Sequence, residues 1–134
     1  MPELPDADAL ALSIIRTAFP AAKVGTQIPA DLLASLPFGL CARFGGAAVD
    51  PRFLDRATFD VQTFGGSRKV ASDFAYDIRE AFRLAAANQT VYPLGHVARY
   101  REVTAPTELR TADQADGLWR FQATYSLFLR PATV

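Results

Sequence analysis

The spacing of apolar residues changes at Ser67, and this change constrains the fold more than any other feature of the chain. Before Ser67, residues 58–64 (TFDVQTF) largely alternate between apolar and polar side chains, as a half-buried β-strand does. After it, apolar residues recur every three or four positions, which is typical of one face of an α-helix. The stripe consists of Val70, Ala71, Phe74, Ala75, Ile78, Ala81, Phe82 and Ala85. A strand must therefore pass through Gly65–Gly66 into a helix that Ser67 caps and Asn88 ends.

The rest of the chain supplies one more helix and four more strands. Helical spacing runs from Ala7 to Ala18, with Asp6 or Asp8 as the cap and Phe19-Pro20 as the end. Strand patterns cover residues 23–29, 38–44, 96–104 and 118–130. The long alternation in the last of these makes it the clearest strand after residues 58–64.

The segment 38–44 (FGLCARF) also alternates, and we expect Phe38, Leu40, Ala42 and Phe44 to form its buried face. Residues 45–56 contain glycines, Asp-Pro and mixed charges, and we expect a long connection there. The polar run 105–117 is expected to be a second long loop. Loops of this length inside a compact domain are more often functional than idle.

The order of elements is therefore α-β-β-β-α-β-β. Because the helices are segregated from runs of strands, the sequence predicts an α+β fold, with a mainly antiparallel sheet and two helices packed on one face. The chain has 134 residues, half of them hydrophobic, so we expect a single domain spanning residues 1–134.

Composition excludes several classes of function. Lys plus Arg and Asp plus Glu both number 14, so no overall positive charge draws the protein to nucleic acid or to an anionic membrane. Lysine occurs only at Lys23 and Lys69, and a basic set made mostly of arginine suits contacts with protein carboxylates. One cysteine and one histidine rule out an internal disulfide and argue against a Cys/His zinc site. We expect neither a signal peptide nor a membrane span.

The stretch GGSRK, residues 65–69, raises the question of a phosphate-binding loop. A P-loop ends in Gly-Lys-Ser/Thr, whereas Lys69 comes three residues after the last glycine. The dinucleotide pattern G-x-G-x-x-G is also absent. We interpret the glycine pair as a structural turn. Arg68 and Lys69 lie at the positive end of the helix dipole, which suggests that they face an acidic partner or a neighbouring chain.

Catalytic and nucleic-acid functions find little support in the residues. His96 and Cys41 have no recognisable partners in the sequence, and the carboxylates near residues 50–60 have no constrained separation. The run Arg99-Tyr100-Arg101 leaves local contact with a polyanion open. We therefore predict a protein that is not an enzyme, with no catalytic, cofactor-binding or metal site.

Taken together, these elements resemble the tail terminator proteins of long-tailed bacteriophages and phage-like particles, which are grouped with minor tail and neck proteins. The resemblance rests on the N-terminal helix, the motif RFGG (Arg43–Gly46) and the stretch FDVQTFGGSRKVASDFAYDIREAF. In that stretch, a strand reading D-V-Q runs into a helix opening S-R-x-x-A, here Ser67, Arg68 and Ala71. The final strand closes on Arg130, and the likeness covers nearly the whole chain.

This resemblance implies a structural virion protein. It implies a ring of copies, usually six, that caps the tail tube, ends tube polymerisation and provides the surface for joining the head. The implied partners are the tail tube protein on one side and a head–tail connector or neck protein on the other. DNA passes through the lumen without sequence-specific binding, no membrane is involved, and assembly takes place in the host cytoplasm before the protein resides at the tail–neck junction.

The alternatives are a neighbouring neck, head-completion or minor tail protein of similar fold and, behind these, a small nucleic-acid-binding or ligand-binding module. For the ring, we expect the two long loops to make contacts above and below it. The candidate residues for subunit or partner contacts are Arg43, Asp50, Arg52, Arg68, Lys69, Asp73, Arg79, Arg99, Arg101 and Arg130.

Overall fold

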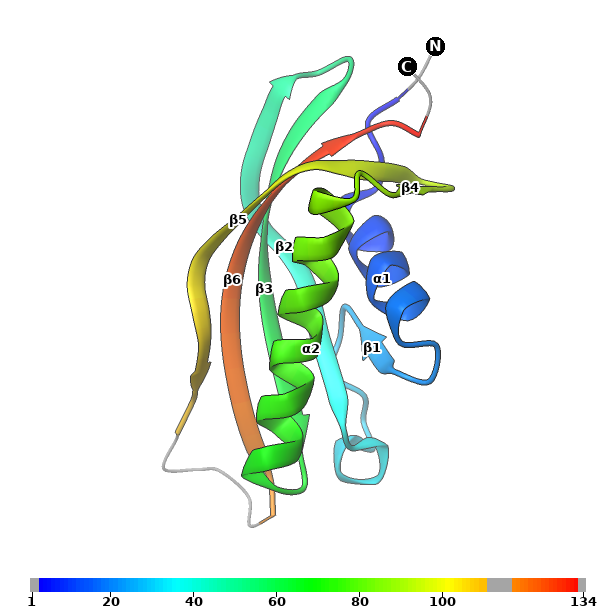
Figure 1. Ribbon diagram of the computed structural model, residues 1–134. Coiled ribbons are helices and arrows are strands. Elements are labelled where there is room, and N and C mark those ends of the chain that lie inside the picture. Colours follow the sequence, from blue (N-terminus) through cyan, green and yellow to red (C-terminus); the bar gives the residue numbers. More distant parts are fainter. Residues whose placement is uncertain (1–2, 111–116, 133–134) are drawn as a thin grey trace.

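The computed structural model describes residues 3–110 and 117–132 and shows one six-stranded sheet covered on one face by two helices (Figure 1). The strand order is β1-β2-β3-β6-β5-β4, and all neighbours are antiparallel except β1 and β2. The predicted α+β fold is therefore confirmed. The elements are α1 (Ala7–Ala18), β1 (Lys23–Gly25), the short 3-10 helix η1 (Leu32–Ser35), β2 (Phe38–Asp50), β3 (Leu54–Gly65), α2 (Arg68–Ala87), β4 (Val91–Tyr92), β5 (Gly95–Glu108) and β6 (Trp119–Arg130).

Both helices begin at the caps that the sequence predicts. The Asp6 side chain accepts a hydrogen bond from the backbone N–H of Ala9, and the Ser67 hydroxyl accepts one from Val70. Such caps satisfy backbone donors that have no partner within the helix. Asn88 ends α2, as expected.

The core lies between the helices and the sheet. The apolar stripe of α2 is buried from Ala71 to Ala85, as are the inward faces of β3 and β6, whereas Val70 at the start of the stripe is exposed. Aromatic rings join these layers: Phe82 meets Tyr125 edge-on at 5.5 Å between ring centroids. Leu10, Ile14 and Ile15 of α1 extend the same core. Burial of each such side chain contributes about 1.5–3 kcal/mol relative to exposure.

The glycine pair before α2 has a structural role. A Cβ atom placed on Gly65 would lie 2.7 Å from the backbone N of Ala71, so no larger residue fits where β3 ends against α2. The Thr63 hydroxyl donates to the Ala71 carbonyl across the same contact, at 2.8 Å. Gly66 has open space around it. The interpretation of this stretch as a strand-to-helix turn agrees with this geometry.

The expected loop at residues 45–56 is wrong, because this segment forms the outer half of a β-hairpin. β2 continues to Asp50, a turn follows, and β3 begins at Leu54. The glycines are adapted to the hairpin: Gly46 has a φ of +90°, and a Cβ there would lie 2.0 Å from the Arg56 carbonyl oxygen. Glycine therefore permits a close approach between the strands instead of ending one of them.

The expected buried face of β2 is wrong in part, because Phe38 is buried as expected, Leu40 and Ala42 are half-buried, and Phe44 is exposed. Cys41 is fully buried, whereas Phe44 is 64% exposed. The face toward the helices consists of Gly39, Cys41 and Arg43, because Gly39 leaves room for the Phe74 ring, 3.1 Å from where a Cβ would stand. Apolar content alone therefore points to the wrong side of this strand.

Three smaller differences concern strand length. β1 is shorter than the expected 23–29, and the two-residue β4 was not expected. β5 runs on to Glu108 and includes Pro106, which is possible because most of β5 is an edge strand and a proline there interrupts no central ladder. The second expected loop is therefore shorter, and residues 111–116 of it lie outside the described part of the chain.

Candidate functional site

The described residues offer surfaces for assembly. Within residues 3–110 and 117–132, no group of three or more His, Cys, Asp or Glu side chains is placed to hold a metal ion. No described helix is long and apolar enough to cross a membrane. Three surfaces stand out instead: a projecting hairpin, the uncovered face of the sheet, and a groove beside α2.

The first surface is the arm, which we define as residues 44–54 at the end of the β2–β3 hairpin. In Figure 1 this hairpin extends beyond both helices at the top of the molecule. Its apolar side chains have no cover: Phe44, Val49 and Phe53 are 64%, 59% and 37% exposed. A hairpin with exposed apolar side chains is typical of a surface that another molecule covers.

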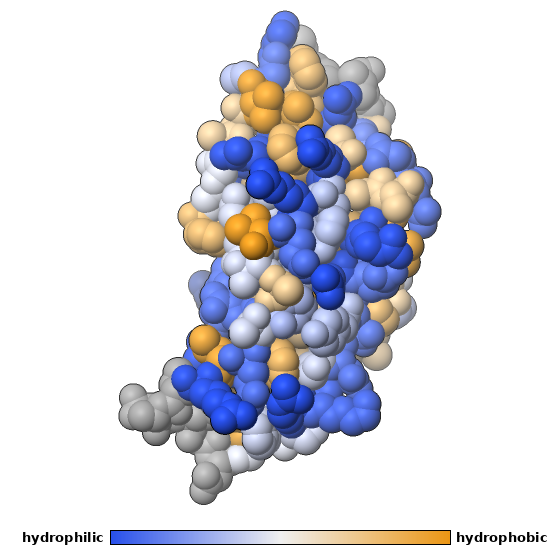
Figure 2. Space-filling view, turned by 60° about the vertical axis from the view of Figure 1, so that its left-hand side comes forward, coloured by the Kyte–Doolittle hydropathy of each residue, from blue (hydrophilic) through white to orange (hydrophobic). Residues whose placement is uncertain are grey.

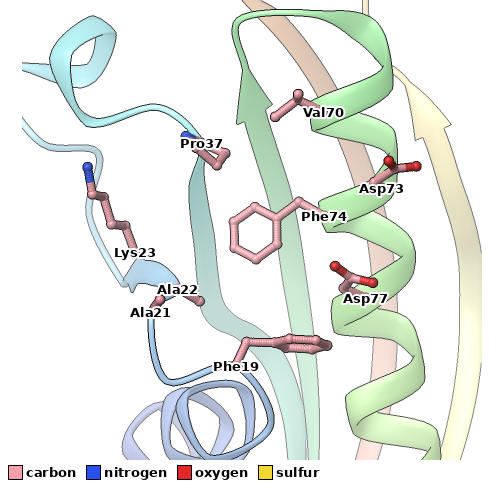
Figure 3. A pocket seen from close by; sticks show the side chains of 9 residues that line it. All are labelled: Phe19, Ala21, Ala22, Lys23, Pro37, Val70, Asp73, Phe74 and Asp77. Carbon is pink, nitrogen blue, oxygen red and sulfur yellow. The ribbon is translucent and has the colours of Figure 1, made fainter.

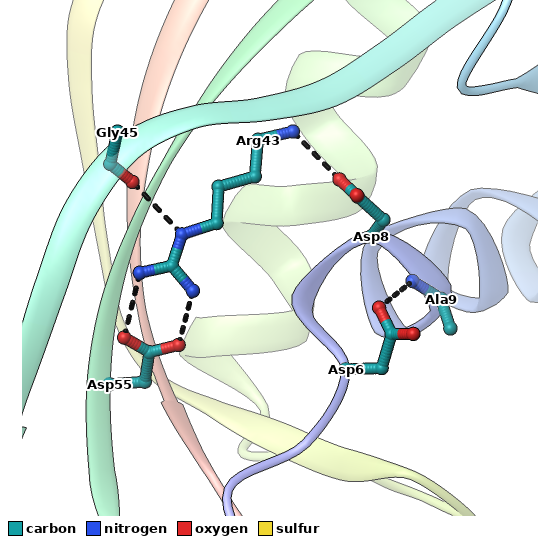
Figure 4. A network of polar contacts seen from close by, with 6 residues as sticks. All are labelled: Asp6, Asp8, Ala9, Arg43, Gly45 and Asp55. Atoms are coloured by element: carbon teal, nitrogen blue, oxygen red, sulfur yellow. Dashed lines mark hydrogen bonds and ion pairs between the residues drawn. The ribbon is translucent and has the colours of Figure 1, made fainter. Parts of the chain in front are cut away.

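A network around Arg43 fixes the root of the arm (Figure 4). The Arg43 guanidinium donates to both carboxylate oxygens of Asp55, at 2.6 and 3.0 Å, and its Nε donates to the Gly45 carbonyl. The backbone N–H of Arg43 donates to Asp8 of α1, at 2.7 Å. The network therefore connects α1, β2 and β3 at the point where the arm leaves the body.

The tip of the arm carries its own ion pair. Arg52 donates through Nε and Nη2 to the two oxygens of Asp50, at 3.1 and 3.0 Å, and its guanidinium lies 5.7 Å from the centre of the Phe53 ring. The hydrogen bond from Arg52 holds the pKa of Asp50 below its usual value. The tip therefore presents a guanidinium and a phenyl ring side by side.

The second surface is the open face, the side of the sheet without helices. Its polar residues on β3, β6 and β5 are Arg56, Thr58, Asp60, Gln62, Arg120, Gln122, Thr124, Ser126, Arg99 and Arg101. At its centre, Asp60 accepts hydrogen bonds from Gln62 and Gln122, and Gln62 accepts two from Arg120. This ladder ties β3 to β6 through side chains as well as backbone.

Arginines cover the aromatic rings of the open face. Arg120 lies 5.2 Å from the Phe64 ring centre, and Arg99 lies 5.8 Å from that of Phe128. The planar guanidinium of arginine suits cation–π contacts of this kind. Figure 2, which shows the molecule from one side, has hydrophilic and hydrophobic side chains interspersed, with orange gathered in its upper part.

The exposed side of α2 is neutralised within the chain. Arg68 pairs with Glu108, Lys69 with Asp73, Arg79 with Glu102, and Arg83 with Glu80. Exposed pairs such as Lys69–Asp73 contribute little to stability, because water screens them. These ion pairs leave the exposed side of α2 with a weak electrostatic field.

The third surface is the groove, a cavity of about 330 Å³ between the segment after α1 and the side of α2 (Figure 3). Its floor is apolar and includes the Phe74 and Phe19 rings. Asp73 and Asp77 stand on the α2 wall, and Lys23 of β1 lies opposite. Desolvation, with Asp73 nearby, raises the pKa of Asp77. Among the described residues, Asp77 has no ion-pair partner.

Comparison with known families decides what kind of protein this is. The model of the phage tail termination protein family matches residues 3–133, nearly the whole chain. The chain belongs to this family. No curated protein matches its sequence. Membership in the tail termination family supports a structural role in the phage tail, and it implies tail-associated assembly partners and a place in the virion.

For a tail termination protein, the candidate contact residues fall into separate groups instead of one site. Arg43, Asp50 and Arg52 belong to the arm or its root; Arg68, Lys69, Asp73 and Arg79 lie along α2; Arg99 and Arg101 lie on the open face. Arg130 ends β6 opposite His96, and its Nε is buried. Arg43 is the one most fully engaged inside the chain, with four hydrogen bonds.

Sequence reasoning missed two features of this tail termination protein. The Asp60 ladder had a signal, because Asp60 and Gln62 alternate on β3 as Arg120 and Gln122 do on β6. The groove had none, since it joins residues from the end of α1, β1, the start of β2 and α2.

Proposed function

We propose that this protein forms a ring that caps the phage tail tube, ends tube polymerisation and provides the surface to which the head joins. The family resemblance implies six copies in this ring. The ring lies at the tail–neck junction of the virion after assembly in the host cytoplasm. Its partners are the tail tube protein on one side and a connector or neck protein on the other.

The arm is the observation that carries this proposal. An isolated subunit leaves a hairpin with exposed Phe44, Val49 and Phe53 beyond its core. Covering that arm with a different surface of the next copy gives a heterologous contact, and heterologous contacts close into rings when the rotation permits. Family membership supports a tail protein, and the arm supports a tail protein that assembles through unlike surfaces.

The open face suits the lumen of such a ring. It presents amides and hydroxyls around the Asp60 ladder, and its arginines are partly occupied by aromatic rings. Its four arginines outnumber its one carboxylate, Asp60, and attraction of such cations to phosphates does not depend on base sequence. A face of this kind allows DNA to pass without sequence-specific contacts, and we propose that it lines the channel.

Electron microscopy of particles made without this protein tests the proposal. We expect tails of uncontrolled length and no attached heads, and normal particles when the protein is supplied again. Native mass spectrometry of the protein, alone and with tail tubes, should show a closed ring. Tails of normal length that merely lack heads would contradict tube termination and favour the alternative, a neck or head-completion protein.

A further inference from the structure

We propose that the tip of the arm of one copy docks in the groove of the next copy, with Phe53 on the apolar floor and Arg52 paired with Asp77. The inference rests on the proposed function, because the molecule that occupies the groove is a second copy of this chain in the ring. It adds the specific contact that joins neighbouring subunits.

The groove has the size and composition to receive a side chain of this kind. Its volume of about 330 Å³ is at the lower end of the range for small-molecule sites, about 300–1,000 Å³, so it holds one or two side chains. The Phe74 and Phe19 rings line the floor, and Val70, 42% exposed, stands at the α2 wall. A phenyl ring placed there would meet other apolar groups on several sides.

The α2 wall of the groove offers a carboxylate to a cation. Lys69 already pairs with Asp73, at 2.8 Å, whereas Asp77, one turn further along α2, lacks an ion pair within the described part of the chain. Burial raises the pKa of Asp77, and Asp73 adds to this effect. Asp77 is exposed at this wall, so a guanidinium that reaches the groove can form a charge-assisted pair with its carboxylate.

The arm supplies that cation next to an aromatic ring. Arg52 is 77% exposed at its side chain and lies over the Phe53 ring. A guanidinium has five N–H donors, and Asp50 occupies only Nε and Nη2, so donors remain for a second carboxylate. The neighbouring Asp50 would then lie on the side of Lys23, the cation on the opposite wall of the groove.

The complementarity identifies the occupant as a second copy. Each chain presents one arm tip with an exposed ring and cation, and one groove with an apolar floor and an unpaired carboxylate. When each copy gives its arm to one neighbour and receives an arm from another, the contact generates a closed ring or an open filament. This is the geometry that a cap on a tube needs.

Charge reversal tests the contact. We expect Arg52→Glu alone and Asp77→Arg alone each to weaken ring formation about tenfold or more, since each places like charges together. An equal mixture of the two variants should form rings again, because each arm then meets a groove of opposite charge. Arg83→Glu, on another side of α2, is the matched control and should leave the ring intact. Unchanged thermal unfolding of the variants at low concentration shows that they fold.

Cross-linking gives a second measurement that does not depend on affinity. Phe53→Cys combined with Lys23→Cys should form disulfides between chains on oxidation, up to a closed ring, and neither single variant should do so. Cys41 is buried and does not interfere.

The outcomes separate this inference from the proposed function. Rings that survive both charge reversals, or that give no cross-link, overturn the arm-in-groove contact and leave the ring standing. Wild-type protein that forms no ring on tail tubes overturns both.

Discussion

Arg43 and Asp55 meet side by side across the β2–β3 hairpin, with both Nη atoms of the guanidinium on the two carboxylate oxygens. Asp55 is 6% exposed at its side chain and Arg43 29%. The pair lies where the arm leaves the body, and α1 adds a third contact through Asp8. Arg43 therefore stabilises contacts within the subunit. A substitution of Arg43 would affect assembly through the position of the arm.

Removing the guanidinium should destabilise the fold. We expect Arg43→Ala to lower the free energy of unfolding by about 3 kcal/mol, the lower end for breaking a buried pair, because Arg43 keeps some exposure. Arg43→Lys should lose less, since it keeps the charge but not the paired donors. Urea unfolding at a concentration where the protein is monomeric measures both. Arg52→Ala at the exposed pair is the control, and we expect a much smaller loss there because water screens the pair. Equal losses at the two sites would refute the distinction.

The two adjacent glycines before α2 should respond differently to the same change. Gly65→Ala places a methyl group 2.7 Å from the backbone of Ala71, and we expect a loss of about 1–3 kcal/mol from overpacking. Gly66→Ala meets no atom within 4 Å, its φ is not positive, and it should change stability by less than about 1 kcal/mol. Thermal and urea unfolding compare the pair. A phosphate-binding role for the turn would predict instead that both variants lose an anion-dependent stabilisation.

Asp77 should give stability an unusual dependence on pH. Burial raises the pKa of this carboxyl above 3.8 in the folded state, so the folded protein holds the proton more tightly than the unfolded chain. That contribution is complete at low pH and is lost as the pH rises through the raised pKa. Asp77→Asn should therefore be more stable than wild type at pH 7, and the difference should shrink toward pH 3.

Glu80 provides the opposite case on the same helix. The hydrogen bond from Arg83 lowers the pKa of Glu80, so its stabilisation is present at pH 7 and is lost as the pH falls through that lowered pKa. Glu80→Gln should be less stable than wild type at pH 7, with the difference closing in acid. Urea unfolding from pH 3 to pH 7 measures both variants, and differences of the same sign would contradict the assignment of Asp77.

Cys41 should be unreactive in the folded protein. Burial raises the pKa of its thiol, and the nearby carboxylates of Asp8 and Asp60 act in the same direction. Thiolate is the reactive form, so labelling with a thiol reagent should follow global unfolding of the protein. Labelling rates measured across a urea series test this. A rate that stays fast without denaturant would show that the core around β2 opens locally.

The helices could be predicted from the sequence because two independent signals agree there. The apolar stripe of α2 has a period that no strand shares, and Ser67 and Asn88 mark its ends by chemistry that depends on neighbours in the chain. The same agreement fixes α1 between Asp6 and Phe19. Local signals of this kind need no knowledge of the tertiary fold.

The arm could not be predicted because its signals depend on contacts across the hairpin. Gly45-Gly46 and Asp50-Pro51 suggest breaks when taken alone, but Gly46 lies against the Arg56 carbonyl and Pro51 lies in a turn. The prediction of the buried face of β2 failed for a similar reason, since Gly39 makes space for the Phe74 ring of α2. The groove combines four separate segments, and only the folded chain brings them together.

The hydrogen-bond network around Arg43 also affects how fast subunits can assemble. Because α1, β2 and β3 hold the root of the arm before any partner arrives, docking the arm does not require a disordered segment to be ordered. Preorganised segments lose less conformational entropy on association than flexible ones. We therefore expect encounter between subunits, and not folding of the arm, to govern the rate at which the proposed ring closes.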